Sequence, residues 1–241
     1  MVSRRVSRRP LPARWARVGE GLIDVVYPKR CAGCGARGDW VCPLCFEDLP
    51  LFAEPWCARC GIPHNVGPCR CPDIPADIGN CRAVGPYAGW LRSAIIALKY
   101  EEEPARAAHL GDLLASTLDT CDRDVVVSPV PLHPRREHER GYNQSFLVAR
   151  QAGRSLDLPV LPLLRRTRAT ARQVGLDAAG RRVNVVGAFE ADAEVIAQRR
   201  ATHVVLVDDV MTTGATLEAC AAALRAAGVE RIDVATLARD N

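Results

Sequence analysis

The stretch HVVLVDDVMTTGATL, which begins at His203, constrains the fold more than any other part of the chain. An apolar run leads directly into Asp208 and Asp209, then into a loop rich in threonine, and then into the helical pattern GATLEACAAALRAAG. In open α/β sheets, ligands bind outside the carboxyl ends of the strands. The order strand, acid pair, loop and helix therefore predicts a ligand site around these two aspartates.

The rest of the chain from about residue 79 alternates between strand-like and helix-like segments. We expect a strand that enters a turn in 81–89 and strands in 124–128, 160–164, 203–207 and 231–238, with helices in 90–100, 104–118, 142–156 and 214–228, the last ending at Gly228. This alternation favours a mostly parallel sheet flanked by helices. The predicted fold class is therefore α/β, and 241 residues are enough for one such domain and a smaller module.

Eight of the 11 cysteines lie between residues 31 and 71, mostly in Cys-x-x-Cys pairs. Two such pairs can close a tetrahedral structural zinc site, and thiolates grouped in this way suit a metal better than disulfides. A closed site of four thiolates leaves no position open for a substrate, so a catalytic role is disfavoured. Iron–sulfur ligation is the less favoured alternative. The first predicted zinc ligands are Cys31, Cys34, Cys42 and Cys45.

The second predicted zinc site is less regular than the first. Its expected ligands are Cys57, Cys60, Cys69 and Cys71, and the last two form a Cys-x-Cys pair that is one residue short of the usual spacing. His64 is an alternative ligand in place of one of them. An arrangement that mixes pairs from the two quartets also stays open. Cys220, on the apolar face of a predicted helix, is expected to be a buried structural thiol.

Composition and charge divide the chain into three broad segments. We expect a basic, disordered tail in residues 1–20, a cysteine-rich module in 21–78 and the α/β domain in 79–241. A nucleic-acid-contacting arm is the alternative role for the tail. The net charge of +4 is too small to argue for nucleic acid by itself. No apolar run is long enough to span a membrane and no secretory signal is apparent, so a cytoplasmic location is expected.

The loop after the acid pair has the features of a phosphate site. Backbone N–H groups at the start of a helix point toward one spot, and the helix dipole favours an anion there. The small and hydroxyl side chains of this loop let a phosphate approach closely, although it is not a Walker loop. The acid pair is better suited to accept hydrogen bonds from the vicinal hydroxyls of a ribose. The loop residues in question are Met211, Thr212, Thr213, Gly214, Ala215 and Thr216.

These motifs resemble those of a known family. VVLVDDVMTTGATL is similar to the phosphoribosyl-pyrophosphate (PRPP) motif of type I phosphoribosyltransferases. SPVPLHPRREHERGYNQSFLVAR and RATARQVGLDAAGRRVNVVGAF resemble stretches of ComF-type proteins (ComFC and GntX relatives), in which a double zinc ribbon precedes this domain. In the second of these stretches the matching positions are Gln173, Arg181 or Arg182, and Asn184.

The resemblance implies roles for particular residues. Asp208 and Asp209 would hold the ribose hydroxyls of PRPP, and the loop from Met211 to Thr216 would hold its 5-phosphate. Mg²⁺ would accompany the diphosphate of the ligand. The remaining expected ligand-binding residues, including Arg140 as a catalytic clamp, are Val130, Pro131, Lys99, Arg140, Asn143 and Gln144.

Several charged or polar residues near these motifs have two interpretations. Arg135 and Arg136 are either further clamps on the diphosphate or solvated surface charges. Asn143 and Gln144 could instead cap or orient the following helix. His133 and His138 have no evident partner, so they are treated as loop histidines.

Two classes of function stay open at this point. The first is a Mg²⁺-dependent transferase that uses PRPP, with an unknown acceptor. The second is a non-catalytic zinc-ribbon adaptor that binds single-stranded DNA and senses a phosphoribosyl ligand. The family resemblance implies a link to DNA uptake or DNA use in some members, but a fold of this kind does not decide between catalysis and sensing.

Overall fold

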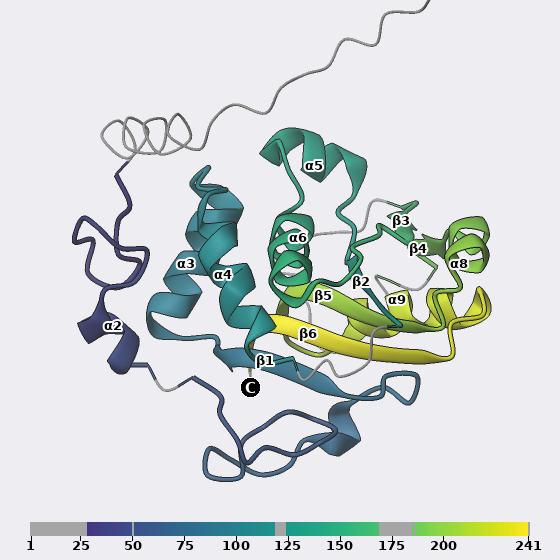
Figure 1. The fold of residues 1–241 in the computed structure, drawn as a ribbon, viewed down its shortest axis with the longest axis horizontal. Coiled ribbons are helices and arrows are strands. Elements are labelled where there is room, and N and C mark those ends of the chain that lie inside the picture. The colour runs from purple at the N-terminus through teal and green to yellow at the C-terminus, as the bar shows by residue number, and fades with distance from the viewer. Residues whose placement is uncertain (1–27, 50, 119–123, 169–184, 186, 241) are drawn as a thin grey trace, which may run out of the picture.

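A computed structural model describes residues 28–49, 51–118, 124–168, 185 and 187–240 (Figure 1). The expected basic tail and the family-like positions Gln173, Arg181, Arg182 and Asn184 lie outside the described residues. None of the helices in the described part of the chain is long and apolar enough to cross a membrane.

A four-stranded parallel sheet forms the centre of the molecule, with strand order β1-β6-β5-β2. Val127 forms an isolated parallel bridge with Val160 at the β2 edge, and β3 and β4 form a separate antiparallel pair. This arrangement confirms the predicted mostly parallel α/β sheet. The strands are β1 (Cys81–Pro86), β2 (Val125–Pro129), β3 (Leu164–Arg166), β4 (Phe189–Ala191), β5 (His203–Met211) and β6 (Arg231–Arg239).

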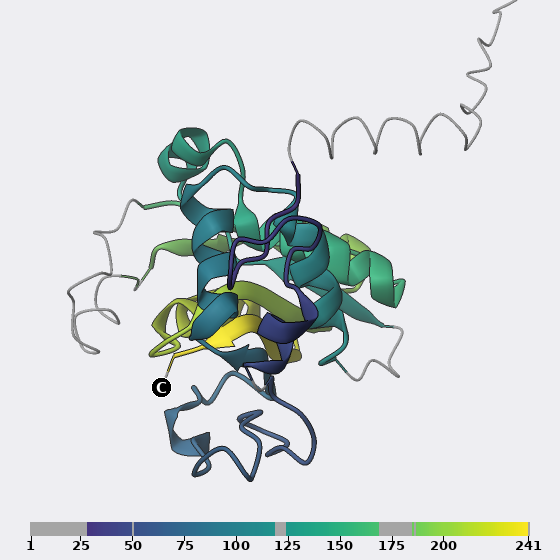
Figure 2. The same ribbon diagram turned by 90° about the vertical axis from the view of Figure 1, so that its left-hand side faces the viewer.

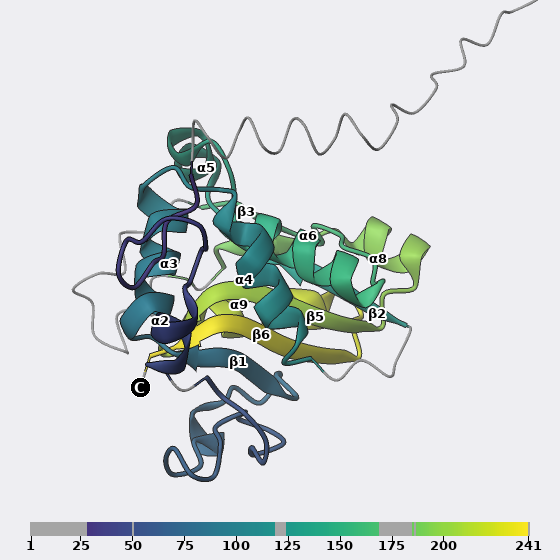
Figure 3. The same ribbon diagram turned by 60° about the vertical axis from the view of Figure 1, so that its left-hand side comes forward.

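Helices cover both faces of the sheet (Figures 1 and 3). Alternate residues of a strand point to opposite faces. In β5, Val205 and Val207 pack in the cluster formed with α3, α4 and α6, whereas Val204 and Leu206 pack in the cluster that contains α8 and α9. The helices are α2 (Pro43–Glu47), α3 (Gly89–Tyr100), α4 (Arg106–Ala115), α5 (Pro134–Arg140), α6 (Gln144–Leu156), α8 (Ala193–Arg199) and α9 (Ala215–Ala226), with a 3₁₀ turn at Cys71–Asp73.

Three segments differ from the sequence-based expectations. Strand β5 continues through the acid pair to Met211, because its backbone stays paired with β6 as far as Arg239. The arginine-rich segment expected as a loop is helix α5, which Pro134 begins and Gly141 ends with a φ of 82°. The expected strand 160–164 is largely absent, and β3 begins only at Leu164.

The cysteine-rich region divides into two modules that pack against opposite faces of the sheet. The first cysteine module (residues 28–49) contributes Leu49 to the cluster of α3, α4 and α6. The second (residues 51–80) contributes Cys60, Ile62, Ile74 and Ile78 to the cluster on the other face. In Figure 2 the first module lies in front of the helices and the second lies below the sheet.

Helix α6 matters for function because its first residues reach the acid pair, and its position depends on a close approach to α4. Gly111 on α4 lies directly against α6. A Cβ atom at this position would lie 2.5 Å from the Cβ of Gln151 and 2.9 Å from the carbonyl oxygen of Val148. Real Cβ atoms do not approach other atoms so closely, so the glycine allows the two helices to cross.

We therefore expect Gly111→Ala to destabilise the protein by about 1–3 kcal/mol, because overpacking at the crossing outweighs the better helix propensity of alanine. Urea unfolding of the zinc-loaded protein measures this change. Arg154→Ala, at an exposed position of α6, is the control and should stay within about 0.5 kcal/mol of wild type. A Gly111→Ala protein as stable as wild type would contradict the close packing.

Candidate functional site: an acid pair, a phosphate-type loop and two cysteine clusters

A pocket of about 290 Å³ opens at the carboxyl ends of the strands, where the sequence predicts the ligand site. One wall consists of Asp208 to Leu217, that is, the end of β5, the loop and the first turn of α9. The other lining residues are Tyr87, Lys99 and Tyr100. The pocket therefore unites the acid pair and the whole expected phosphate loop.

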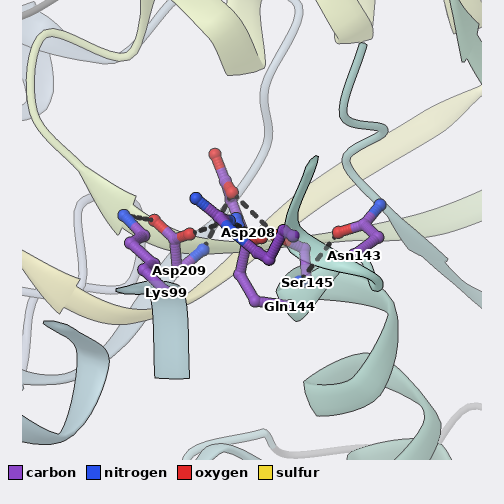
Figure 4. A network of polar contacts seen from close by, with 7 residues as sticks. Lys99, Asn143, Gln144, Ser145, Asp208 and Asp209 are labelled. Carbon is purple, nitrogen blue, oxygen red and sulfur yellow. Dashed lines mark hydrogen bonds and ion pairs between the residues drawn. The ribbon is translucent and has the colours of Figure 1, made fainter. Parts of the chain in front are cut away.

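Asp209 is held from two sides. The Lys99 ammonium lies 2.6 Å from its Oδ1, and the Gln144 side-chain amide donates to its Oδ2 at 2.6 Å (Figure 4). Burial alone would lower the pKa of Lys99, but the Asp209 carboxylate more than offsets this, so the pKa is raised and the lysine stays charged. Both oxygens of Asp209 thus have a cationic or amide donor from the protein itself.

Asp208 is the more available acid of the pair. Its Oδ1 accepts from the Ser145 hydroxyl at 3.0 Å and from the backbone N–H of Asp209 at 2.9 Å. Burial, followed by the charge of Asp209, raises its pKa to about 7, and the side chain keeps partial exposure where it lines the pocket. Asp208 can therefore offer its second oxygen to a hydroxyl donor of a ligand.

The loop has the backbone conformation expected of an anion site. Gly214 precedes the first turn of α9 with a φ of 75°, in the left-handed region that glycine adopts at little cost. A Cβ atom there would also lie 3.2 Å from the Met211 side chain, so the position is closely packed. No side chain caps the start of α9, and the residues of its first turn, Ala215 to Leu217, line the pocket.

Several expected ligand-binding residues make contacts next to the pocket and are not among the residues that line it. Asn143 caps α6 by accepting from the backbone N–H of Ser145, and its amide donates to the Val130 carbonyl at 3.0 Å. Arg140 donates to the Gln144 side chain, which in turn binds Asp209. Val130, Pro131, Arg140, Asn143 and Gln144 are not among the pocket-lining residues.

The other arginines and histidines of this region are on the surface helix α5. Arg135 pairs with Glu139 at 2.9 Å, with both side chains mostly exposed. His133 caps the helix, since its Nδ1 accepts from the backbone N–H of Arg135. These contacts favour the solvated interpretation of Arg135 and the view of His133 as a local structural residue.

Sequence reasoning missed Ser145, Tyr87 and Tyr100. Ser145 follows directly after the family-like Asn143 and Gln144, and Tyr100 follows directly after Lys99. Their proximity to predicted residues was the available signal. Tyr87 had no comparable signal; it follows β1, and its backbone N–H donates to the carbonyl of Arg239, at the end of β6.

The thiols of each predicted cysteine quartet converge, and no ligand atom in a quartet is more than 4.8 Å from another. Zn–S bonds of about 2.3 Å in a tetrahedral site place sulfur atoms about 3.8 Å apart. The Sγ atoms of Cys34 and Cys42 are 3.7 Å apart, and those of Cys60 and Cys69 are 3.8 Å apart. The two quartets stay separate, and neither group includes His64.

The electrostatics of these clusters also fit a bound cation. Hydrogen bonding to neighbouring thiols, first of all to Cys42 and Cys69, raises the pKa of Cys45 and Cys71 to about 12. Four thiolates so close together repel one another, and a divalent metal relieves that repulsion. In the first cluster, the backbone N–H groups of Gly33 and Cys42 also point to the Cys31 sulfur, at 3.4 and 3.3 Å.

The second cluster is tied to the sheet close to the pocket. The buried Arg239 guanidinium, at the end of β6, donates to the Cys60 carbonyl at 2.7 Å. Arg239 is the β6 partner of Met211, the first residue of the loop. Pro75 of the second cysteine module also lies within contact distance of a Cβ placed at Gly214. The metal cluster and the loop therefore share a common support.

We expect the purified protein to contain two zinc ions per chain. Cys42→Ser and Cys69→Ser should each reduce the content to about one, because each removes one of four thiolates from a closed site. Elemental mass spectrometry measures zinc and iron together. His64→Ala is the control and should retain both ions. Loss of one ion in that variant, or iron in place of zinc, would contradict the two all-cysteine sites.

Comparisons with known proteins agree with this arrangement. Residues 22–77 match the family model described as a double zinc ribbon domain, and residues 143–241 match that of a phosphoribosyl transferase domain. Among solved structures, a Bacillus subtilis glutamine PRPP amidotransferase complexed with ADP and GMP is similar over 53% of this chain and 25% of its own, with a TM-score of 0.35 and 23% identity. That likeness is too low to support an argument.

Curated relatives match most of the chain. Competence protein F of Haemophilus influenzae is 33% identical over 87% of this chain and 96% of its own length. DNA utilization protein YhgH of Escherichia coli K12 is 34% identical over 85% and 92%, and competence protein ComFC of Bacillus subtilis is 24% identical over 76% and 77%. The chain therefore belongs to the ComF family, in which a double zinc ribbon that binds structural zinc is joined to a domain of the phosphoribosyltransferase type.

Proposed function

We propose that the pocket binds PRPP or a related ribose 5-phosphate ligand together with Mg²⁺. The observation that carries this proposal is the union of Asp208, the loop from Met211 to Thr216 and Lys99 in one pocket. Asp208 accepts from the ribose hydroxyls, and the loop N–H groups bind the 5-phosphate. Mg²⁺ enters with the diphosphate of the ligand and supplies positive charge there.

Asp208 and Asp209 have different roles in this proposal, and the difference follows from their contacts. Asp209 is fixed by Lys99 and Gln144, so it sets the charge and position of the strand end. Asp208 touches the ligand, and Ser145 orients it. Arg140 acts through Gln144 as a positioning residue in this scheme, instead of as a clamp on the diphosphate.

In the transferase version of this function, the bond from C1 of the ribose to the pyrophosphate oxygen breaks. A bond from C1 to a nucleophilic acceptor forms, pyrophosphate leaves with the electron pair, and the acceptor proton passes to solvent. The protein contributes positioning and electrostatic stabilisation. We assign this pocket to the domain from residue 79 to 241 and the zinc-binding role to residues 21–78. The grouping of eight cysteines into two clusters of the metal-binding type supports a cytoplasmic location.

We expect wild-type protein to bind PRPP in the presence of Mg²⁺, and Asp208→Asn to bind it at least tenfold more weakly. The reason is that hydrogen bonds to a charged acceptor contribute about 1.5–3 kcal/mol. Isothermal titration calorimetry of the zinc-loaded protein measures the difference. Asp157→Asn is the matched control, because it removes an exposed acid at a left-handed position that asparagine also tolerates. Equal affinities for all three proteins would contradict the assignment of Asp208.

Asp208→Asn also distinguishes the proposed function from a second candidate, an adaptor that binds single-stranded DNA without catalysis. The names of the relatives, which refer to competence and DNA utilization, support this candidate. Single-stranded DNA binding that depends steeply on salt and survives Asp208→Asn would favour the adaptor. PRPP binding without DNA binding would favour the transferase.

We also expect PRPP affinity to depend on pH through Asp208. Its pKa of about 7 is raised, so the acid is largely protonated at pH 6 and largely ionised at pH 8. Because the carboxylate accepts the ligand hydroxyls, affinity should fall about tenfold from pH 8 to pH 6. The charged or titratable groups that face Asp208 are Asp209, Lys99, Arg166 and Cys220.

The measurement is the same titration across this pH range in wild type and in Asp208→Asn. The ligand phosphates also titrate, so the difference between the two proteins isolates the contribution of Asp208. An identical pH profile in both proteins would show that Asp208 does not titrate in the binding equilibrium.

A further inference from the structure

The second cysteine cluster contains an irregular pair of thiols. Cys69 and Cys71 are separated by a single residue, whereas the other pairs of both quartets have the Cys-x-x-Cys spacing. Their Sγ atoms lie 3.0 Å apart, and the other thiols that contact one another within the two clusters are 3.4–3.8 Å apart. A tetrahedral zinc site holds two sulfur atoms about 3.8 Å apart. The short spacing thus brings these two sulfur atoms closer together than zinc binding requires.

The same pair can be reached from solvent. Cys69 is exposed and Cys71 is half-buried. Between them, Arg70 has a bent backbone with a φ of −107° and a ψ of 26°, and a 3₁₀ turn begins at Cys71. A disulfide needs Cα atoms about 4.4–6.8 Å apart, a separation that the two residues on either side of such a bend can adopt. An oxidant can therefore reach both thiolates, and the two sulfur atoms can join with a local rearrangement.

The first cysteine cluster is better protected from oxidation. Cys31 is buried, and the backbone N–H groups of Gly33 and Cys42 donate to its sulfur at 3.4 and 3.3 Å. Such hydrogen bonds withdraw charge from a thiolate and make it less nucleophilic. The exposed Cys34 lies 3.7 Å from Cys42, which is a normal separation for two zinc ligands. We therefore expect the two clusters to differ in their resistance to an oxidant.

A short stretch of backbone connects the irregular pair to the loop before α9. The Cys71 carbonyl accepts from the backbone N–H of Ile74 at 3.1 Å. The next residue, Pro75, has a ring atom 3.8 Å from a Cβ placed at Gly214, in the loop. Arg59 of the same module donates to the carbonyls of Ile74 and Pro75, at 3.4 Å each. A displacement of Cys71 therefore moves the residue that packs against the loop.

We propose that Cys69 and Cys71 form a redox-sensitive pair, and that their oxidation to a disulfide removes metal from the second cluster and loosens the loop before α9. This control of the pocket rests on the proposed function, in which the loop binds a phosphate. The bond that forms joins the two sulfur atoms, and the two remaining thiolates of the cluster are too few to hold a structural zinc ion.

Hydrogen peroxide is the oxidant in this scheme. One thiolate attacks a peroxide oxygen, the O–O bond breaks, and a sulfenic acid forms while the leaving hydroxide is protonated to water. The other thiolate then attacks the sulfenic sulfur, the disulfide forms, and the displaced hydroxide becomes a second water. Two electrons pass from the two sulfur atoms to the peroxide, and the zinc ion leaves with its charge unchanged.

The test exposes the zinc-loaded, full-length protein to hydrogen peroxide and follows zinc release with a metallochromic dye. One zinc ion should leave at least about tenfold faster than the other, because only one cluster holds the reactive pair. Peptide mass mapping should then find a disulfide between Cys69 and Cys71. Insertion of one glycine after Arg70 restores the Cys-x-x-Cys spacing, so this variant should bind two zinc ions and release both at the slow rate.

Amide hydrogen exchange tests the link to the loop without any ligand. Exchange in the loop from Met211 to Gly214 should become faster after oxidation and return to its original rate after reduction and addition of zinc. Strand β2 lies at the opposite edge of the sheet from β1, so its exchange is the internal control and should stay unchanged.

Three results would overturn the redox-sensitive pair: equal release rates for the two zinc ions, a disulfide between other cysteines, or an insertion variant as sensitive as wild type. If the insertion variant does not bind two zinc ions, the disulfide map of wild type decides. Unchanged exchange in the loop after zinc loss would overturn the link to the pocket. Failure of the proposed function has a different signature, since neither the reduced nor the oxidised protein would then bind PRPP, whereas zinc release and amide exchange still decide this inference.

Discussion

The parallel pairing of β5 with β6 supports the rest of this structure, because it continues past the acid pair. Asp208 lies opposite Thr236, and Met211 lies opposite Arg239. Each acid is therefore part of a hydrogen-bonded strand instead of a free loop. The N–H group of Asp240 also donates to the Met211 carbonyl, so the ladder holds the chain up to the first loop residue. A site built on a sheet in this way is more exactly positioned than one built on a loop.

Two adjacent carboxylates at a partly buried strand end need interactions that offset the loss of hydration and their mutual repulsion. Burial and mutual repulsion both disfavour the charged pair, and this is why the pKa of Asp208 is raised. The structure compensates Asp209 with the Lys99 ammonium and the Gln144 amide. Asp208 has only hydroxyl and backbone donors on one oxygen. The electrostatic cost left at Asp208 is what makes it receptive to a ligand that donates hydrogen bonds.

The two cysteine modules are also connected to the sheet that carries the site. They pack on opposite faces of the sheet, and the second module contacts the site region through Arg239 and Pro75. A region so rich in cysteine, proline and glycine is too small for a core of its own, so metal would supply much of its folding energy. Zinc bound in the second module would thus stabilise the end of β6 as well as the module itself, and would link metal content to the geometry of the loop before α9.

The sequence by itself determined the features that depend on local pattern. The α/β class followed from the alternation of elements, the two thiol clusters from Cys-x-x-Cys spacing, and the ligand edge from the order of strand, acids, loop and helix. Even the irregular Cys69 and Cys71 pair joined its quartet as predicted, because a short turn still lets both thiols face one centre. These outcomes need no knowledge of which distant residues meet.

Only the tertiary structure decided what each side chain does at the site. Arg140 and Asn143 fit a family pattern, and the structure shows their contacts: Arg140 donates to the Gln144 side chain and Asn143 caps α6. Lys99 pairs with Asp209 across 110 positions of sequence, and Tyr100 comes to the pocket with it. Such pairings depend on how α3 and α6 pack over the sheet. Packing is a property of the whole core, so no local spacing could have revealed it.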